Sequence, residues 1–273
     1  MSGPTVLLPS QVNTDDLIFK PNKDNKPSAI KNFLITHKES ILHIQFPECE
    51  VFSLNCATNP QTGQPFNPNK LSLALSLPEE RPSCKNTIEM LKKMKEKIID
   101  IVVKNSITIF SKPRSIESVT DIFSEPLRYS KLKDENGNVI EGKINTQYPP
   151  LISFPVYKDE NGELSIKAES ANGKPVSLDN RDIKGSYVTV IARFNGIWSN
   201  KTAFGMTWRI VKMRIIFVAR PQKKIGFIND VDRIAEDNDE EDDDVVSEYG
   251  DASVERQKIP ATIPILNDSD ADE

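Results

Sequence analysis

The chain has 273 residues, 37% of them hydrophobic and 27% charged, and a formal net charge of −5 at pH 7. This length allows one well-packed domain with extensions or two small domains, and the low hydrophobic content predicts that part of the chain is not packed. Two histidines and three cysteines without a CxxC pair (Cys49, Cys56 and Cys84) argue against a zinc site and a disulfide framework, so we expect no metal and no cofactor.

Residues 1–30 are polar and rich in proline apart from an apolar island at 17–19, and we expect them to form an N-terminal arm, with one short strand as an alternative. One domain is expected over 31–228. It starts with three strand-like runs, of which the second and third alternate in polarity as half-buried strands do, and a loop rich in Asn, Gln and Pro precedes the last run. These runs cover 33–36, 41–46 and 71–77, and the loop covers 57–70.

Residues 86–104 are predicted to form one added α-helix. Asn86 and Glu89 suit the N-cap and N3 positions, and apolar residues recur after them at helical spacing. The other side of this helix is typical of a solvated face, with auxiliary contacts to phosphate as the alternative. It carries four lysines: Lys92, Lys93, Lys95 and Lys97.

From Ile107 to Val190 the pattern is that of β-structure. Asn-Gly is a strong hairpin signal because both residues accept positive φ, and three such pairs occur here. They are Asn136-Gly137, Asn161-Gly162 and Asn172-Gly173, and they predict an antiparallel meander or barrel. The longest strands are expected at 187–194 and 204–219.

The window from Ile183 to Asn229 contains no Asp or Glu, although the whole chain is acidic. It holds both tryptophans, Trp198 and Trp208, and nine basic residues: Lys184, Arg193, Lys201, Arg209, Lys212, Arg214, Arg220, Lys223 and Lys224. Single-stranded nucleic acid is bound by cations that follow the phosphates and by aromatic rings on which bases stack. Core packing is the alternative for a tryptophan, and we expect one of the two to stack and one to be structural.

Side-chain alternation along 187–194 predicts a ligand face with Tyr187 and Arg193, opposite a core face. The core face holds Val188, Val190, Ala192 and Phe194. In the next strand, strict alternation puts Trp208 with Lys212 and Arg214, and Arg209 on the opposite face. Because residues 210–218 are apolar on both sides, a register break or bulge is an alternative, and the wet face stays open.

The charge is divided along the chain. From Asp230 onward there are 17 acids against three bases, a net charge of −14, whereas the rest carries +9. Such an acidic segment cannot bury enough apolar surface to fold, so we expect a disordered tail over 229–273. A tethered polyanion competes with a ligand for a basic groove and, once displaced, is free to recruit partners through the apolar segment 259–266.

The segment GIWSNKTAFGMTWRIVKMRI, together with the acidic tail, resembles the single-stranded-DNA-binding proteins of large nucleocytoplasmic DNA viruses, a group related to those of T7-like phages. The match covers mainly residues 150–225 and the tail. The resemblance implies an OB-fold barrel, roles in DNA replication, recombination or repair, dimers, and a tail that contacts replication proteins. By position it makes Trp198, Phe204, Trp208 and Arg209 the residues of the motif.

We therefore predict a mainly β protein, an OB-fold-like antiparallel barrel with one added helix and a disordered acidic tail. Catalytic motifs are absent from the sequence, so no enzymatic activity and no catalytic residue is expected. The expected function is sequence-independent binding of single-stranded DNA. The predicted nucleic-acid-binding residues are Tyr187, Arg193, Trp198, Lys201, Phe204, Trp208, Arg209, Lys212 and Arg214.

Two alternatives remain at this point. One is a structural or virion-core protein that coats nucleic acid, and the other is a non-enzymatic interaction adaptor whose basic strands meet an acidic protein. The N-terminus lacks the basic and apolar regions of a signal peptide, and the sequence has no run of about 18 apolar residues. We expect no membrane association and an intracellular location, in the host cytoplasm or nucleus, or packaging into a virion from that pool.

Overall fold

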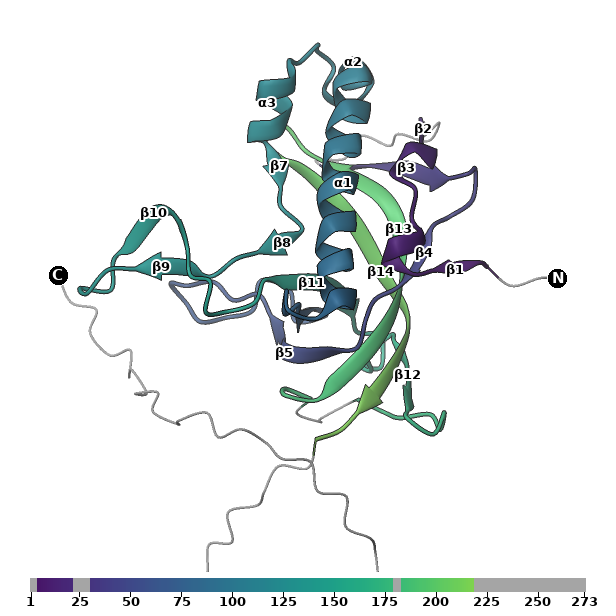
Figure 1. Cartoon of the computed structure of the whole chain (residues 1–273), viewed down its shortest axis with the longest axis vertical. Coiled ribbons are helices and arrows are strands. Elements are labelled where there is room, and N and C mark those ends of the chain that lie inside the picture. Colours follow the sequence, from purple (N-terminus) through teal and green to yellow (C-terminus); the bar gives the residue numbers. More distant parts are fainter. Residues whose placement is uncertain (1–3, 22–29, 179–182, 219–273) are drawn as a thin grey trace, which may run out of the picture. The chain divides into compact units, whose positions relative to one another are not determined.

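The computed structural model describes residues 4–21, 30–178 and 183–218. These residues are mainly β and belong to one compact unit (Figure 1). The acidic tail and three of the nine expected cations, Arg220, Lys223 and Lys224, lie outside the described residues. Among the described residues, no helix is long and apolar enough to cross a membrane.

Five strands close into a barrel: β5 (Cys49–Cys56), β6 (Lys70–Ser76), β11 (Leu151–Tyr157), β13 (Tyr187–Ser199) and β14 (Phe204–Ile216). Hydrogen-bonded ladders join β5 to β6, β6 to β11, β13 to β14 and β13 to β5. Strand β14 lies beside β11 and completes the circuit. In chain order this is strand 1-2-3-5-4 and back to 1, the five-stranded Greek-key barrel of the OB-fold. The predicted fold class is confirmed.

Shorter strands extend the barrel. Strand β4 (His43–Gln45) leads into β5 and pairs with the middle of β13, and β3 (Lys31–His37) pairs with the end of β13. Strand β12 (Lys167–Ser170) runs parallel to β14 along its last residues. Two more short strands are β7 (Phe123–Ser124) and β8 (Leu127–Arg128). Strands β9 (Lys131–Lys133) and β10 (Val139–Ile144) pair only with each other and form a separate two-stranded hairpin.

The described part of the expected N-terminal arm is packed on the domain. Strand β1 (Val6–Leu7) pairs with β4, and β2 (Leu17–Lys20) pairs with β3. Between them lie two short 3-10 helices, η1 (Pro9–Gln11) and η2 (Thr14–Asp16). Leu17 is buried in the core. Residues 17–20 thus form the short strand given as a possibility for the arm, and it pairs with β3.

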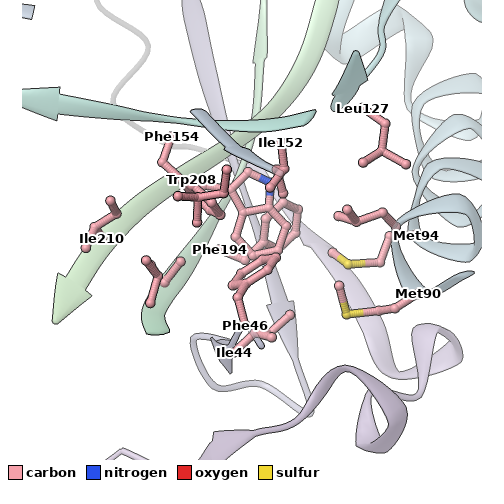
Figure 2. Packing of buried hydrophobic residues seen from close by; sticks show 14 of the residues in the cluster. Ile44, Phe46, Met90, Met94, Leu127, Ile152, Phe154, Phe194, Trp208 and Ile210 are labelled. Atoms are coloured by element: carbon pink, nitrogen blue, oxygen red, sulfur yellow. The ribbon is translucent and has the colours of Figure 1, made fainter. Parts of the chain in front are cut away.

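Helix α1 (Pro82–Lys104) packs its apolar face into the barrel (Figure 1). Figure 2 shows Met90 and Met94 pointing toward Phe46, Phe194 and Trp208 in the shared core. The helix begins four residues before the predicted Asn86, so the predicted N-cap is wrong. Pro82 stands at the first helical position, where its missing N–H costs no hydrogen bond, and Arg81 before it is extended.

The lysine side of α1 is partly ion-paired. Lys95 pairs with Glu125, and Lys97 pairs with Asp15 at 3.1 Å. These contacts agree with a solvated face rather than with a cluster of free cations for phosphate. The start of the next segment corrects another prediction, because α2 (Ser106–Phe110) and α3 (Ile116–Asp121) occupy residues that were expected to be β. Ser115 caps α3 by accepting a hydrogen bond from Ser118 N.

Two of the three Asn-Gly turns connect strands only through isolated bridges. Asn136-Gly137 joins β9 to β10, as predicted. Asn161-Gly162 and Asn172-Gly173 instead lie within turns closed by the bridges Lys158 to Leu164 and Glu169 to Pro175. The turns are confirmed, but the regular strands expected after the second and third are shortened to bridges or to β12.

Candidate nucleic-acid interface

A bulge in β14 decides which face of the basic strands is exposed. Ile191 pairs with Lys212 and Ala192 with Ile210, so Val211 is an extra residue on β14. Arg209, Lys212 and Arg214 are consequently exposed together, whereas Trp208 is buried with Ile210 and Met213. Strict alternation, which put Trp208 with Lys212 and Arg214, is wrong here; the register break given as the alternative is confirmed.

The outer face of β13 is as predicted. Val188, Val190, Ala192 and Phe194 are buried, and Tyr187 and Arg193 are partly exposed on the other side. Arg193 stands directly opposite Arg209 in the β13–β14 ladder, and its Nε donates to Asn195 Oδ1 at 2.7 Å. Like charges directly opposite each other destabilise a strand pair, so this position favours an anion that both guanidinium groups contact.

Glu169 neutralises two of the exposed cations of β14, Lys212 and Arg214. Its carboxylate accepts from Lys212 Nζ at 2.6 Å and from Arg214 Nη2 at 2.9 Å. Hydrogen bonds from Lys212 first, and then from Arg214, lower the pKa of Glu169. Sequence reasoning missed this acid because it lies on β12, outside the acid-free window.

Two of the predicted aromatic residues belong to the core. Phe204 is fully buried, and its ring packs edge-on against Phe123 with centroids 5.2 Å apart. Trp208 is 4% exposed, and its ring packs against that of Phe194 with centroids 4.8 Å apart (Figure 2). Neither ring offers a face for base stacking. Both were included as candidate binding residues on the strength of the motif, and burial on the inner face removes them from that role.

Trp198 is the partly exposed tryptophan, and Gly205 makes room for it. The two residues are directly opposite in the β13–β14 ladder. A Cβ at position 205 would lie 3.0 Å from Trp198 Nε1 and 3.0 Å from Ser124 Cβ. Gly205, which follows Phe204 in the segment GIWSNKTAFGMTWRIVKMRI, therefore leaves room for the indole of Trp198 beside the backbone of β14.

Trp198 borders a groove of about 540 Å³ on the outer face of β6, β11 and β14. It contains a second aromatic ring, Tyr157, which is 46% exposed, and one cation, Lys70. Its lining residues include no acid: Ile30, Asn32, Lys70, Leu71, Ser72, Ser153, Pro155, Tyr157, Trp198, Met206, Thr207 and Trp208. In OB-folds this face of strands 2 and 3 is where oligonucleotides and oligosaccharides bind.

Three polar atoms of the groove residues are buried without a hydrogen-bond partner among the described residues. They are Ser153 Oγ, Thr207 Oγ1 and Trp208 Nε1. An unsatisfied buried polar group costs about 1–3 kcal/mol.

Two loops lead directly into strands that line the groove, at the positions of the two ligand-binding loops of OB-folds. The loop between β5 and β6, residues 57–69, carries Phe66, which is 69% exposed. The loop between β13 and β14, residues 200–203, carries the exposed Lys201. Sequence reasoning found Lys201 but missed Phe66, Tyr157 and Lys70, because the loop was identified by composition alone and β11 was not placed beside β14.

The residues that line the groove include no His, Cys, Asp or Glu. Among the described residues, no group of three or more His, Cys, Asp or Glu side chains could hold a metal ion. Burial raises the pKa of the Cys49 thiol, and the neighbouring Cys84 raises it further. This thiol therefore stays protonated and is a poor nucleophile.

Comparison with known proteins gave no matching family model and no matching curated protein. Among solved structures, the single-stranded DNA-binding protein gp2.5 of bacteriophage T7 is 11% identical, over 66% of this chain and 89% of that one, with a TM-score of 0.39. The single-stranded DNA-binding protein of bacteriophage Enc34, in complex with single-stranded DNA, is 14% identical over 75% and 98%, again with a TM-score of 0.39. A C-terminal truncation of the Enc34 protein is 13% identical over 77% and 99%, with a TM-score of 0.38. These values are too low to carry an argument, so the fold assignment rests on the strand order.

Proposed function

We propose that this protein binds single-stranded DNA without sequence preference and has no catalytic activity. The observation that carries the proposal is the groove on β6, β11 and β14, which combines the partly exposed rings of Trp198 and Tyr157 with Lys70 and no acid. Every base has a π-face, so stacking on such rings tolerates any sequence. Arg209 lies two residues beyond Thr207 on the outward side of β14, and the phosphates leaving the groove meet it and Arg193.

The test is a titration with oligo(dT) that follows tryptophan fluorescence and the anisotropy of a labelled strand. Trp198→Ala and Tyr157→Ala should each weaken binding by about 1–3 kcal/mol, roughly 5-fold to 150-fold, because each removes one stacking platform. Tyr148→Ala is the matched control, since Tyr148 is 55% exposed and does not line the groove. Equal affinities for the two tyrosine variants would contradict the proposed site.

Preference among nucleic acids separates this function from that of a coat protein. We expect tighter binding to single-stranded DNA than to duplex DNA or single-stranded RNA of equal length at one salt concentration. A duplex hides the base faces that Trp198 and Tyr157 would contact. Equal affinity for all three would instead favour a protein that coats nucleic acid through its cations.

The sequence resemblance supports the finer parts of the proposal. We propose that the protein serves DNA replication, recombination or repair in a large nucleocytoplasmic DNA virus, acts in the host cytoplasm or nucleus, and contacts replication proteins through its acidic tail. Homodimers and packaging into the virion belong to the same set of proposals. Sedimentation of the full-length protein with and without oligo(dT) tests the dimer.

A further inference from the structure

A second cavity, of about 450 Å³, lies on the other side of the 200–203 loop. Four cations line it, and none of its lining residues is acidic: Lys31, Lys112, Arg114 and Lys201 stand there with Ser111 and Ser199. These cations come from the start of β3, the segment after α2 and the loop between β13 and β14. These four cations, the cation cluster, are far apart in the sequence, so no local charge pattern reveals them. Only Lys201 lies in the acid-free window from Ile183 to Asn229.

The cluster is held in place without a carboxylate. The guanidinium of Arg114 lies 4.5 Å from the centre of the Phe110 ring, and its Nη2 donates to the carbonyl oxygen of Lys201 at 3.3 Å. Its Nη1 donates to Ser118 Oγ at 3.4 Å. Among the described residues, no acid lies within ion-pair distance of any of the four cations. Grouped like charges without a counter-charge favour an anionic ligand.

The backbone beside the cluster is strained. Ser111 ends α2 in the left-handed conformation, with φ of 62°, which residues other than glycine and asparagine adopt at a cost. Such strained positions gather at ligand sites. Ser111 and Lys112 are both exposed where they line the cavity, so the turn presents the Lys112 ammonium group to solvent.

The cavity adjoins the aromatic groove. Trp198 and its partner Asn32 line the groove, and the next pair in the same ladder, Ser199 and Lys31, lines the cavity. Successive residues of a strand point to opposite faces, so the two sites occupy two sides of one sheet end. The 200–203 loop is the edge between them.

We propose that this cavity is a phosphate site, and that the strand bound in the groove turns around the 200–203 loop and places backbone phosphates among Lys31, Lys112, Arg114 and Lys201. The inference rests on the proposed function, and it predicts a binding site longer than the groove. Short strands fill the groove alone, and longer strands gain affinity from the second site.

The experiment measures the affinity of full-length protein for a series of oligo(dT) strands from about 4 to 16 nucleotides, the range of OB-fold site sizes. The variant Lys31→Gln/Lys112→Gln spares Arg114, which supports the local fold. Each phosphate contact on single strands contributes about 0.7 to the slope of log K against log salt, so the loss of two contacts should lower the slope by about 1.4. At 0.1 M salt this corresponds to about 25-fold weaker binding of long strands, with short strands unaffected.

Lys133→Gln/Lys143→Gln is the matched control, because both lysines are exposed on the separate β9–β10 hairpin. If this control and the cavity variant behave alike at every length while Trp198→Ala still weakens binding, the phosphate site is refuted and the groove stands. If Trp198→Ala has no effect at any length, the groove itself fails. A loss in the cavity variant that is equal for the shortest and longest strands also contradicts the proposed path.

Discussion

The carboxylate of Glu169 occupies two cations that a phosphate could otherwise contact. Glu169→Gln should free Lys212 and Arg214, tighten oligo(dT) binding, and raise the slope of log K against log salt by up to about 1.4, since each new contact on a single strand adds about 0.7. Anisotropy titrations at several salt concentrations measure both. Glu163→Gln is the control, because Glu163 is exposed in the neighbouring turn and its substitution removes the same charge. A slope identical in the two variants would show that the strand does not reach β12.

The same carboxylate makes a prediction about pH. The pKa of Glu169 is lowered in the folded protein by hydrogen bonds from Lys212 and Arg214. Its contribution to stability is therefore present above the ordinary glutamate pKa of about 4.3 and is lost as pH falls through the lowered value. Urea unfolding should show wild type more stable than Glu169→Gln at pH 7, and the gap should narrow as the pH is lowered below about 4.3. A gap that persists at low pH would point to a contribution other than charge.

Gly196 is the residue whose replacement should damage the fold most directly. It takes φ of +97°, and a Cβ there would lie 2.1 Å from the carbonyl oxygen of Phe33 and 2.6 Å from the nitrogen of Ile35. Because these are backbone atoms, β3 would have to move away from β13. Gly196→Ala should lower the free energy of unfolding by about 3 kcal/mol or more. Gly173→Ala separates strain from clash, since Gly173 has φ of +73° but nothing within 4 Å; similar losses for both would mean that β3 yields easily.

At the scale of elements, the sequence was informative wherever polarity repeated with one period. The core face of β13 and the end of α1 at Lys104 follow from such repeats. The start of α1 was missed because a plausible cap at Asn86 outweighed Pro82. The helices over 106–121 were missed because β-branched residues favour strands locally, whereas packing beside α1 decides the outcome.

The candidate site was less predictable than the fold. Several cations of the site and Trp198 lie in one acid-free window, which the composition reveals. The bulge at Val211, which turns Trp208 inward, arises from the pairing of β13 with β14, so the sequence of β14 alone does not reveal it. Tyr157, Lys70 and Glu169 enter the site through barrel closure and through β12. Their positions depend on contacts between segments about 40 or more residues apart, and alternation within one strand cannot reveal these contacts.

The loop between β5 and β6 offers a test at the same scale. Phe66 is 69% exposed there and contributes little to the core, so Phe66→Ala should leave the urea midpoint unchanged while weakening oligo(dT) binding by about 1–3 kcal/mol if the ring stacks on a base. Phe52→Ala is the control, because Phe52 is a similarly exposed phenylalanine, at 53%, that lies on strand β5 itself and not on the loop. Unchanged affinity in Phe66→Ala would restrict the site to the strands.

For the whole molecule, the division of charge predicts the effect of truncation. Residues from Asp230 onward carry −14 against +9 in the rest, and we propose that the tail competes with DNA for the cations. Deleting 230–273 should tighten oligo(dT) binding, most of all at low salt where the attraction is least screened. Titration of full-length and truncated protein at two salt concentrations measures this. Equal affinities would mean that the tail never visits the groove.

Because Arg193 and Arg209 stand opposite each other, we expect free protein and DNA-bound protein to respond in opposite ways to ionic strength. Counter-ions screen the two guanidinium groups in the free protein, so added salt should raise its melting temperature. The same salt should weaken the proposed complex with DNA, in which bound phosphates would add stability. Melting curves with and without oligo(dT) should therefore converge from both sides as salt increases. A salt concentration that releases the DNA strand would therefore also stabilise the free protein against thermal unfolding.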